Sequence, residues 1–572
     1  MKKNLLCLLL ALTMLLTLFA GCGTEPASDT TSVAEVSVEK TAEPTAQPAP
    51  EPAAPDSATE DSAADAETAD FVPAEPLTYP LADGDVTFTI LHSEPMLGPM
   101  SGQMNMSTYG DFETIAAGTE YIGVTPEWQS LSQMNGSEQF NLIAASGDYP
   151  DVWTAIDKYY AGGFQKAYED EVIIKLDDYL EQDMPEYWNQ VHESPELLKA
   201  VTNDDGEFMA WYSIYDKTVV NQGYFIRKDW CDMVGKEIPT TIDQLNEILY
   251  AVKDQTGYET VLLLGEGLDT LAEAWRVNGT AASGSGFAYH REGDTLVADI
   301  PSENYRSYIE QLHQWYMDGI VSKNFSELDT SNMSGVMEKQ LAGNLTGVVN
   351  TMVNSMDNLV NDDPNFELAP IVVTVDGENI HTGTGERQFD SSSISSQCDE
   401  SLIPYILGWM NYWYTEEGAM AGSYGVEGLD YEKDADGTIR YLPNITENEL
   451  GYPPMLFSRA RCFSGAAFGL MYQDRTVPFF TEAQNNAIEV WTSRTDSEGA
   501  ISNALCLSPE EGEIVSLYAT DLATYVAEEV PKFVTGDRDF TQWDTFIETC
   551  EGMHLDELLA AYQGAYDRFV EK

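Results

Sequence analysis

Residues 139–155 read QFNLIAASGDYPDVWTA, a stretch typical of a helix, a turn and a buried strand in succession. The apolar residues of Gln139–Ala145 recur at helical spacing, Gly147 suits a helix C-terminus, and a helix does not continue through Pro150. Val152–Ala155 is a short apolar run that predicts a strand. Helices that alternate with strands are the repeating pattern of an α/β fold.

Two further strand patterns lie upstream of this stretch. Val86–Leu91 alternates apolar and polar residues and is rich in β-branched side chains, which indicates a strand. Tyr121–Val124 is a second short apolar run. Three strands separated by helical segments within about seventy residues predict a sheet with parallel strands.

Downstream, the clearest helix pattern is IPTTIDQLNEILYAVKD, residues 238–254. Thr241 can cap this helix, with Gln244 three residues later as in a capping box. Val261–Leu264 predicts a buried strand. Further helices are predicted at Tyr305–Met317, at Ile403–Tyr414 and as two helices between residues 539 and 569.

The N-terminus has the features of a bacterial export signal. Two lysines precede the uncharged apolar stretch Leu5–Phe19, which is too short to span a bilayer comfortably. Leu18–Cys22 then resembles the lipobox of bacterial lipoproteins, whose cysteine is lipidated and becomes the mature N-terminus, although Phe19 stands where that family usually has Leu. The resemblance implies a signal peptide at residues 1–21 and a lipid on Cys22. The alternative is an ordinary secreted protein with a cysteine at this position by chance.

Residues 22–76 have the composition of a disordered acidic tether. Gly23–Asp70 contains no aromatic residue, and Gly23–Tyr79 carries thirteen acidic residues against Lys40 alone. Such a segment buries too little apolar area to offset its chain entropy. We expect it to hold the folded part, residues 77–572, clear of the membrane.

The composition of the whole chain excludes some classes of partner. With 96 acidic and 28 basic residues, the formal net charge is −68, which argues against binding to nucleic acid and against direct adhesion to anionic lipid. Five cysteines remain after Cys7 and Cys22, and their wide spacing and odd number fit neither a disulfide framework nor a zinc site. Buried thiols are the expected role.

Several segments resemble the extracellular solute-binding lipoproteins of carbohydrate ABC importers, in the large branch common in Gram-positive bacteria. The similar segments, in chain order, are IAASGDYPDVW (143–153), FIRKDWCDMVGKEIPTTIDQLNEILYAVKD (225–254), WYTEEGAMAGSYGVEGLDYEKDADGTIRYLPN (413–444) and VPKFVTGDRDFTQWDTFIETCEGMHLDELLAAYQGAYDRF (530–569). They span almost the whole chain after the tether.

The resemblance implies a two-lobed α/β clamshell of the periplasmic-binding-protein type (type II-like), with a ligand cleft between discontinuous lobes. We expect the first lobe at about 77–215 with part of 390–480, and the second at about 216–389 with part of 481–572. By the same resemblance, we expect the protein to capture a carbohydrate, an oligosaccharide, and to deliver it to the permease subunits of an ABC importer. It would do so as a monomer, held on the outer face of the cell membrane by its lipid alone.

A sugar site needs aromatic faces for the apolar patches of the rings, and carboxylates, amides or arginines for the hydroxyl groups. Residues of these types occur in loops and turns next to predicted strands. The candidate ligand-binding residues are Glu94, Asp151, Trp153, Trp211, Tyr212, Trp275, Arg276 and Glu427.

Each of these candidates also has a structural interpretation. Trp153 can be a core residue, Asp151 can cap the turn before its strand, and Glu427 can hold a hinge turn in YGVEG. Trp211 and Trp275 are the preferred stacking residues, because a large aromatic side chain in a loop needs an explanation.

Enzyme functions find little support. No HExxH, GxSxG, GxxxxGK or GxGxxG motif occurs, and the six histidines are scattered. A secreted glycoside hydrolase stays an alternative, because its two carboxylates need no sequence spacing; a surface adhesin without transport is another. No cofactor or metal site is predicted. Asp434–Gly437 predicts a hairpin turn rather than a calcium loop, and structural calcium elsewhere on so acidic a chain stays open.

Overall fold

A computed structural model describes residues 71–132, 134–279, 288–325, 341–381, 387–463, 466–496, 501 and 505–572. The predicted signal peptide, Cys22 and the tether as far as residue 70 lie outside these residues. Within the described ranges, no helix combines the length and apolar character that a membrane crossing requires.

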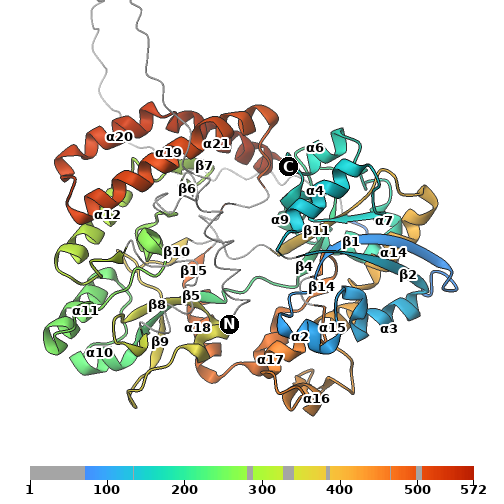
Figure 1. Ribbon diagram of the computed structural model, residues 1–572, viewed down its shortest axis with the longest axis horizontal. Coiled ribbons are helices and arrows are strands. Elements are labelled where there is room, and N and C mark those ends of the chain that lie inside the picture. Colours follow the sequence, from blue (N-terminus) through green and yellow to red (C-terminus); the bar gives the residue numbers. More distant parts are fainter. Residues whose placement is uncertain are drawn as a thin grey trace, which may run out of the picture. The chain divides into compact units, whose positions relative to one another are not determined.

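Two sets of elements surround two separate apolar cores, and we call these sets the first and second lobes. The first lobe is built from residues 86–215 and 388–471 (labelled on the right in Figure 1). Its strands and helices are β1 (Val86–Ser93), α2 (Pro99–Met104), α3 (Glu113–Ile122), β2 (Val124–Leu131), α4 (Gly136–Ser146), β3 (Val152–Thr154), α5 (Ile156–Tyr159), α6 (Gly163–Glu169), α7 (Leu180–Asp183), α8 (Pro185–His192), α9 (Pro195–Val201), β4 (Trp211–Tyr215), β11 (Gln388–Ile394), α14 (Ile403–Tyr412), α15 (Glu416–Tyr424), β12 (Tyr431–Lys433), β13 (Ile439–Tyr441), α16 (Pro443–Thr446), α17 (Pro454–Ser458) and β14 (Leu470–Met471).

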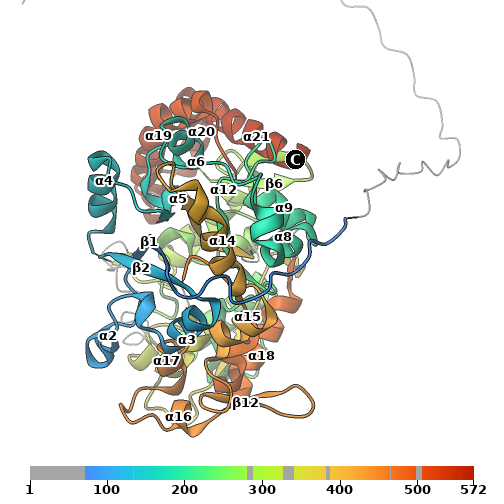
Figure 2. The ribbon, with the colours of Figure 1, turned by 90° about the vertical axis from the view of Figure 1, so that its right-hand side faces the viewer.

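The first lobe contains a six-stranded sheet in the order β14-β4-β11-β3-β1-β2. β1 pairs in parallel with β2 and β3, as the sequence predicts, whereas β11 pairs antiparallel with β3 and β4. Helix α14 packs against α3, α7, α8 and β2 (Figure 2). The apolar residues of β1 therefore lie in a covered sheet, consistent with the buried Phe88, Ile90 and Leu91.

Most local predictions in this lobe are confirmed, and one is partly wrong. The helix, Gly147 turn and strand of residues 139–155 appear as α4, a left-handed Gly147 and β3. Of the predicted strand Tyr121–Val124, however, the first two residues end α3, and Gly123 at φ 79° closes that helix. The strand begins only at Val124, because a left-handed glycine ends a helix within this short apolar run.

The second lobe is built from residues 222–381 and 480–572 (labelled on the left in Figure 1). Its elements are β5 (Gln222–Arg227), α10 (Lys228–Val234), α11 (Ile242–Thr256), β6 (Tyr289–Glu292), β7 (Thr295–Ala298), α12 (Glu303–Met317), β8 (Val348–Met352), β9 (Leu368–Ile371), β10 (Ile380–His381), α18 (Glu482–Ser493), β15 (Thr495–Asp496), α19 (Pro509–Thr535), α20 (Trp543–Gly552) and α21 (Leu555–Glu571). β5 is the central strand of a three-stranded antiparallel sheet, β8-β5-β9.

The second lobe confirms the predicted helices and corrects one strand. Thr241 caps α11 by accepting a hydrogen bond from the Gln244 backbone N–H, although the Gln244 side chain bonds the N–H of Thr240 rather than of Thr241. Val261–Leu264 is buried as expected. It is not a strand, because only Leu262 pairs, through a single bridge to Val321.

The chain passes between the lobes three times: at 216–221, between His381 and Arg387, and at 472–479. These crossings begin or end on adjacent strands and are joined by hydrogen bonds. The Tyr215 N–H donates to the Arg387 carbonyl oxygen (2.7 Å), and the Asp216 carboxylate accepts from the Gln473 N–H (2.8 Å). The crossings therefore lie side by side where they leave the first lobe.

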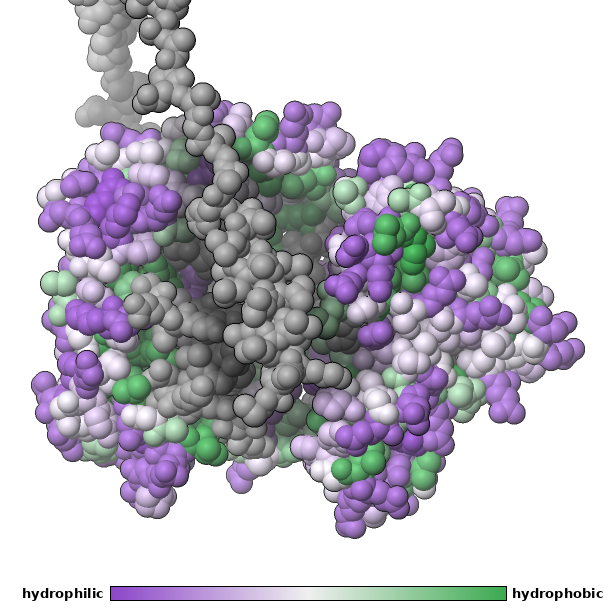
Figure 3. All heavy atoms as spheres, in the orientation of Figure 1, coloured by the Kyte–Doolittle hydropathy of each residue, from purple (hydrophilic) through white to green (hydrophobic). Residues whose placement is uncertain are grey.

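The folded part starts earlier than the sequence predicts. Phe71 stacks on His192 with 5.0 Å between ring centroids, and the Ala74 N–H donates to the Asn189 side-chain oxygen (2.8 Å). The expected boundary at Leu77 is thus corrected to about residue 71, because α8 binds the last residues of the predicted tether. On the face drawn in Figure 3, hydrophilic side chains cover most of the coloured surface, with scattered apolar patches.

Candidate functional site

A cavity of about 1110 Å³ lies between the lobes and takes its lining from both of them and from the crossings. The first lobe contributes residues of the loop after β1, of β4, of β11 and of α17, and the second contributes residues of β5, β8, β9 and α18. The volume exceeds the usual range of a small-ligand site. It therefore has room for a ligand of several rings.

The second lobe presents a polar wall organised around Glu266. The Tyr224 hydroxyl donates to one Glu266 carboxylate oxygen, and the Asn350 amide donates to the other at 2.8 Å. The Leu271 N–H in turn donates to the Tyr224 oxygen (2.8 Å). These bonds fix the Glu266 carboxylate at the cavity surface, because both of its oxygens have a defined donor.

Glu273 lies on the same wall, in the 3-10 helix η3 (Ala272–Trp275). Burial and the nearby Glu266 carboxylate raise the pKa of Glu273 from 4.5 to about 7. Burial likewise raises the pKa of Glu266. Two carboxylates in one poorly hydrated wall oppose each other's ionisation, and together they favour a ligand that donates hydrogen bonds.

The aromatic side chain best placed for a sugar ring is Tyr215, at the end of β4. It lines the cavity, is only partly buried, and stacks on Phe389 at 4.2 Å between centroids. Phe480 also lines the cavity and is partly buried, whereas Tyr109, Phe112 and Trp491 are buried. A ring held by a second aromatic ring is a rigid stacking surface.

Cations of the lining lie on the crossings and on the first lobe. Lys217 pairs with Asp474 at 2.7 Å, joining two crossings. Arg475 donates to the Tyr472 carbonyl oxygen (3.1 Å) and lies over the Tyr215 ring. Arg459, after α17, is exposed. The cationic side chains of the lining thus lie away from the second-lobe wall that carries Glu266 and Glu273.

The structure places the three predicted tryptophans in the cores. Trp153 and Trp211 are 0% exposed and Trp275 is 7% exposed, and none of them lines the cavity. Trp275 packs on Tyr308 at 4.9 Å in the second core. The expectation that Trp211 or Trp275 faces the cleft is therefore corrected: tertiary packing covers both rings.

Asp151 and Arg276 make local structural contacts. The Asp151 carboxylate accepts from the Thr89 N–H (2.7 Å) and hydroxyl (2.8 Å), which ties β3 to β1. Arg276 forms an exposed ion pair with Asp376 at 3.0 Å. Asp151 thus has the structural role that the sequence offered as an alternative.

The remaining candidates also lie outside the cavity lining. Glu94 is exposed beside Pro95–Leu97, which do line the cavity, and Tyr212 is partly buried three residues before Tyr215. Glu427 is exposed on the turn after α15, a turn held by the buried Asp430, whose carboxylate accepts from the Val426 N–H (2.9 Å). Binding by these residues stays a prediction, and none of the eight candidates lines the cavity.

The sequence indicated none of the residues that line the cavity, among them Tyr215, Glu266, Glu273, Asn350 and Arg459. Only Tyr215 carried a usable signal. It ends a strand just before a crossing, and strand ends that face a partner domain are frequent ligand positions. Glu266 and Asn350 are 84 residues apart, and their contact follows from the tertiary fold.

No disulfide joins the five cysteines of the described residues, and Cys231, Cys462 and Cys550 are buried. Likewise, no group of three or more His, Cys, Asp or Glu side chains in the described ranges has the geometry to hold a metal ion. Asp434–Gly437 forms the turn of the β12–β13 hairpin, as predicted: the Gly437 N–H donates to the Asp434 carbonyl oxygen (2.9 Å).

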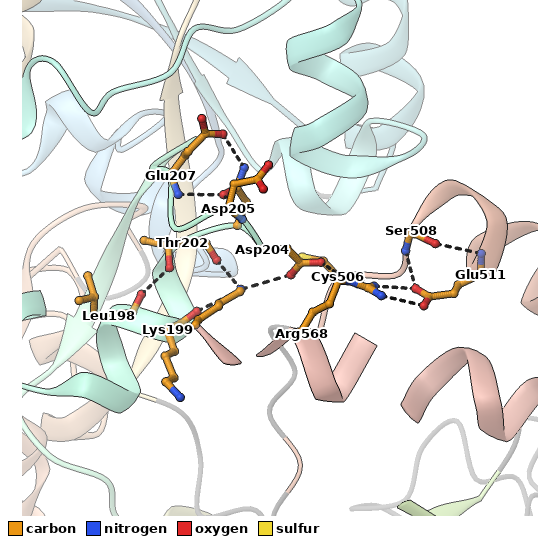
Figure 4. Close-up of polar contacts among 12 residues, drawn as sticks. Leu198, Lys199, Thr202, Asp204, Asp205, Glu207, Cys506, Ser508, Glu511 and Arg568 are labelled. Carbon is orange, nitrogen blue, oxygen red and sulfur yellow. Dashed lines mark hydrogen bonds and ion pairs between the residues drawn. The ribbon is translucent and has the colours of Figure 1, made fainter. Parts of the chain in front are cut away.

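The lobes also meet through a polar cluster at the end of α21, which we call the C-terminal clasp (Figure 4). Arg568 donates to the Asp204 carboxylate of the first lobe (2.6 Å) and to both Glu511 oxygens of its own lobe (2.8 and 2.6 Å). The Lys572 ammonium donates to the Thr202 carbonyl oxygen (2.8 Å), and the Lys199 ammonium donates to the Val570 carbonyl oxygen (2.7 Å). The clasp is thus a contact between the lobes outside the crossings.

Two discontinuous α/β lobes, three crossings and a cavity between the lobes define a binding protein that holds a ligand between its lobes. A solved structure of an extracellular solute-binding protein from Bifidobacterium longum subsp. infantis has the same fold, with a TM-score of 0.66 at 17% identity over 85% of this chain and 99% of that one. No family model matches the chain.

Curated relatives match most of the chain. Lipoprotein LipO of Bacillus subtilis is 24% identical, covering 82% of this chain and 91% of the relative. The polygalacturonan/rhamnogalacturonan-binding protein YtcQ of the same organism is 21% identical (75% and 83%). The fructooligosaccharide ABC transporter substrate-binding protein FusA of Streptococcus pneumoniae is also 21% identical (78% and 85%). The chain thus has the fold of solute-binding proteins and is similar over most of its length to relatives that are named as lipoproteins and as carbohydrate-binding or ABC transporter substrate-binding proteins.

Proposed function

We propose that the protein captures an oligosaccharide between its lobes and delivers it to the permease subunits of an ABC importer. The observation that carries the proposal is the cavity, which combines hydrogen-bonding carboxylates and amides with the partly exposed Tyr215 ring. Hydroxyl groups and ring faces of a sugar match these two kinds of surface. The relatives YtcQ and FusA support a carbohydrate ligand, since their names specify carbohydrates.

The proposal includes the location of the protein. The lipobox-like segment Leu18–Cys22 supports attachment by a lipid to the outer face of the cell membrane, and the relative LipO is a lipoprotein by name. The acidic segment after Cys22 would then be the tether. Binding and delivery require one copy of the chain and no cofactor.

A ligand screen tests the function directly. The melting temperature of the full-length chain in detergent is measured with and without neutral and acidic oligosaccharides, and each hit is followed by calorimetric titration. A ligand at about 100 times its Kd adds roughly 2.7 kcal/mol to the free energy of unfolding. We expect at least one oligosaccharide to bind with a stoichiometry of one. If no sugar binds, the proposed function is wrong.

Two controls separate the alternatives to transport. Chromatography of the bound sugar after incubation should recover it intact, whereas shortened products would favour a glycoside hydrolase. Cells that lack the chain should lose uptake of the radiolabelled hit. Unchanged uptake with intact surface binding would favour an adhesin.

A further inference from the structure

The walls of the cavity differ in charge. On the second-lobe wall, Glu266 and Glu273 line the cavity together with Tyr224 and Asn350. Within the described residues, no Lys, Arg or His forms an ion pair with either glutamate. The polar partners of Glu266 are the hydroxyl of Tyr224 and the amide of Asn350, which are both uncharged.

The cations that line the cavity do not neutralise this wall. Lys217 and Arg475 belong to the crossings, where Lys217 pairs with Asp474 and Arg475 bonds the Tyr472 carbonyl oxygen. Arg459 lies on the first lobe. A ligand seated against Glu266 and Glu273 therefore meets acceptors of hydrogen bonds and, above about pH 7 where Glu273 ionises, a negative potential.

A carboxylate on the ligand would be strongly disfavoured at this wall. It would add a further negative group beside the largely buried Glu266 and Glu273, and like charges brought together at a binding surface are a common means of rejecting a wrong ligand. Hydroxyl groups, by contrast, can donate to carboxylate oxygens and accept from the Asn350 amide.

We propose that the wall formed by Glu266, Glu273, Tyr224 and Asn350 makes the cavity selective for oligosaccharides without carboxylates, and that it excludes oligouronates. This inference rests on the proposed function and specifies its substrate class. The two relatives named for their ligands do not decide the question, because one is named for an acidic polysaccharide and the other for a neutral oligosaccharide.

The test compares neutral and acidic probes of equal length on the full-length chain. The neutral probes are tri- and tetrasaccharides of fructose, glucose, galactose and mannose, and the acidic probes are tri- and tetramers of galacturonate, mannuronate and guluronate. We expect the tightest ligand to be neutral, with every uronate at least about 100-fold weaker, as like-charge contact implies. A uronate that binds as tightly as the best neutral probe overturns the inference and leaves the proposed function standing. Binding of no sugar at all defeats the proposed function itself.

A substitution in the wall tests its role in selectivity. Binding is compared at about pH 8, where Glu273 is mostly ionised. There Glu273→Gln keeps the shape of the side chain and removes its charge, so the ratio of uronate Kd to neutral Kd should fall by about tenfold or more. Glu548→Gln, an exposed glutamate on α20 outside the cavity, is the matched control, and its ratio should not change. The inference is overturned if the Glu273→Gln chain discriminates against uronates as strongly as the unaltered chain does. It is also overturned if the unaltered chain binds a uronate and Arg459→Ala alone abolishes that binding.

Discussion

Arg568, in the last turn of α21, donates to the Asp204 carboxylate across the two lobes at a distance of 2.6 Å. Both side chains are partly shielded from solvent, and the Arg568 guanidinium also holds both oxygens of Glu511. A bidentate arginine pair of this kind has a fixed geometry and is stronger than an exposed ion pair. It links the end of the chain to the turn before β4.

Arg568→Ala should loosen the contact between the lobes. Since the cavity takes its lining from both lobes, we expect affinity for the sugar ligand to fall by about three- to tenfold, which corresponds to a loss of roughly 1 kcal/mol of binding free energy. The radius of gyration measured by small-angle X-ray scattering should increase. Arg306→Ala, which removes the exposed pair with Glu310 within α12, is the control and should change neither quantity. Equal behaviour of the two variants would show that the clasp does not hold the lobes.

Glu273 should make stability depend on pH. Its pKa is about 7 in the folded protein against an ordinary 4.5, so between these values the folded state holds more protons than the unfolded chain. The free energy of unfolding therefore decreases as pH rises from about 4.5 to about 7. Glu273→Gln should remove this loss and be more stable than the unaltered chain at about pH 8, by on the order of 2 kcal/mol. Urea unfolding at several pH values measures the free energy of unfolding of both chains. If the extra stability of the Glu273→Gln chain does not decrease toward pH 4.5, the raised pKa of Glu273 is contradicted.

Tyr215 should contribute to ligand affinity rather than to folding. Tyr215→Ala removes a partly exposed ring of the cavity, so we expect binding to weaken by roughly 2 kcal/mol with little change in the melting temperature of the ligand-free chain. Trp211→Ala, four residues earlier in the core, should instead cost about 3–5 kcal/mol of stability. Calorimetric titration and thermal melting of both variants separate the two roles, and a Tyr215→Ala chain with unchanged affinity would refute the stacking role.

The first residues after the tether should matter for stability. A chain that begins at residue 71 keeps the Phe71–His192 stack and the hydrogen bonds between Ala74 and Asn189, so it should melt at the temperature of the full-length chain. A chain that begins at Leu77 loses them and should be less stable by about 1–2 kcal/mol. Both chains should bind sugar equally, because residues 71–76 do not line the cavity. If the chains that begin at residue 71 and at Leu77 melt at the same temperature, residues 71–76 do not belong to the folded part.

Cys22 should carry the lipid. In cells grown with a labelled fatty acid, the unaltered chain should incorporate label and stay with the membrane fraction, because the thiol of Cys22 is the proposed acceptor. Cys22→Ala should be unlabelled and either unprocessed or released. Cys7→Ala, within the apolar stretch of the signal, is the matched control. Incorporation of label into the Cys22→Ala chain would disprove the lipobox interpretation.

The sequence predicted helices, strands and turns well wherever the residues that determine them are adjacent in the chain. The turn at Gly147, the Thr241 cap and the alternation of Val86–Leu91 each specify a short piece of backbone, and each appears in the structure. Gly123 shows the limit of such signals. An apolar run that contains a glycine fits a strand or a helix end equally well, and the structure uses it for both.

The site was far less predictable, because its residues are brought together by the fold. Trp211 and Tyr215 belong to one short strand and look alike in sequence, yet one is buried in the core and the other lines the cavity. What separates them is the packing contributed by residues 394–468. Glu266 and Asn350 likewise carry no local signal of their contact.

The joined crossings limit how the lobes can move. Tyr215 is bonded to Arg387, and Asp216 to both Met471 and Gln473, so a change of backbone angle in one crossing strains the other two. Three unconnected linkers would let the lobes swing, slide and twist independently, whereas these crossings are bonded to one another where they leave the first lobe and share a common pivot there. A change in the angle between the lobes therefore has to involve all three crossings together.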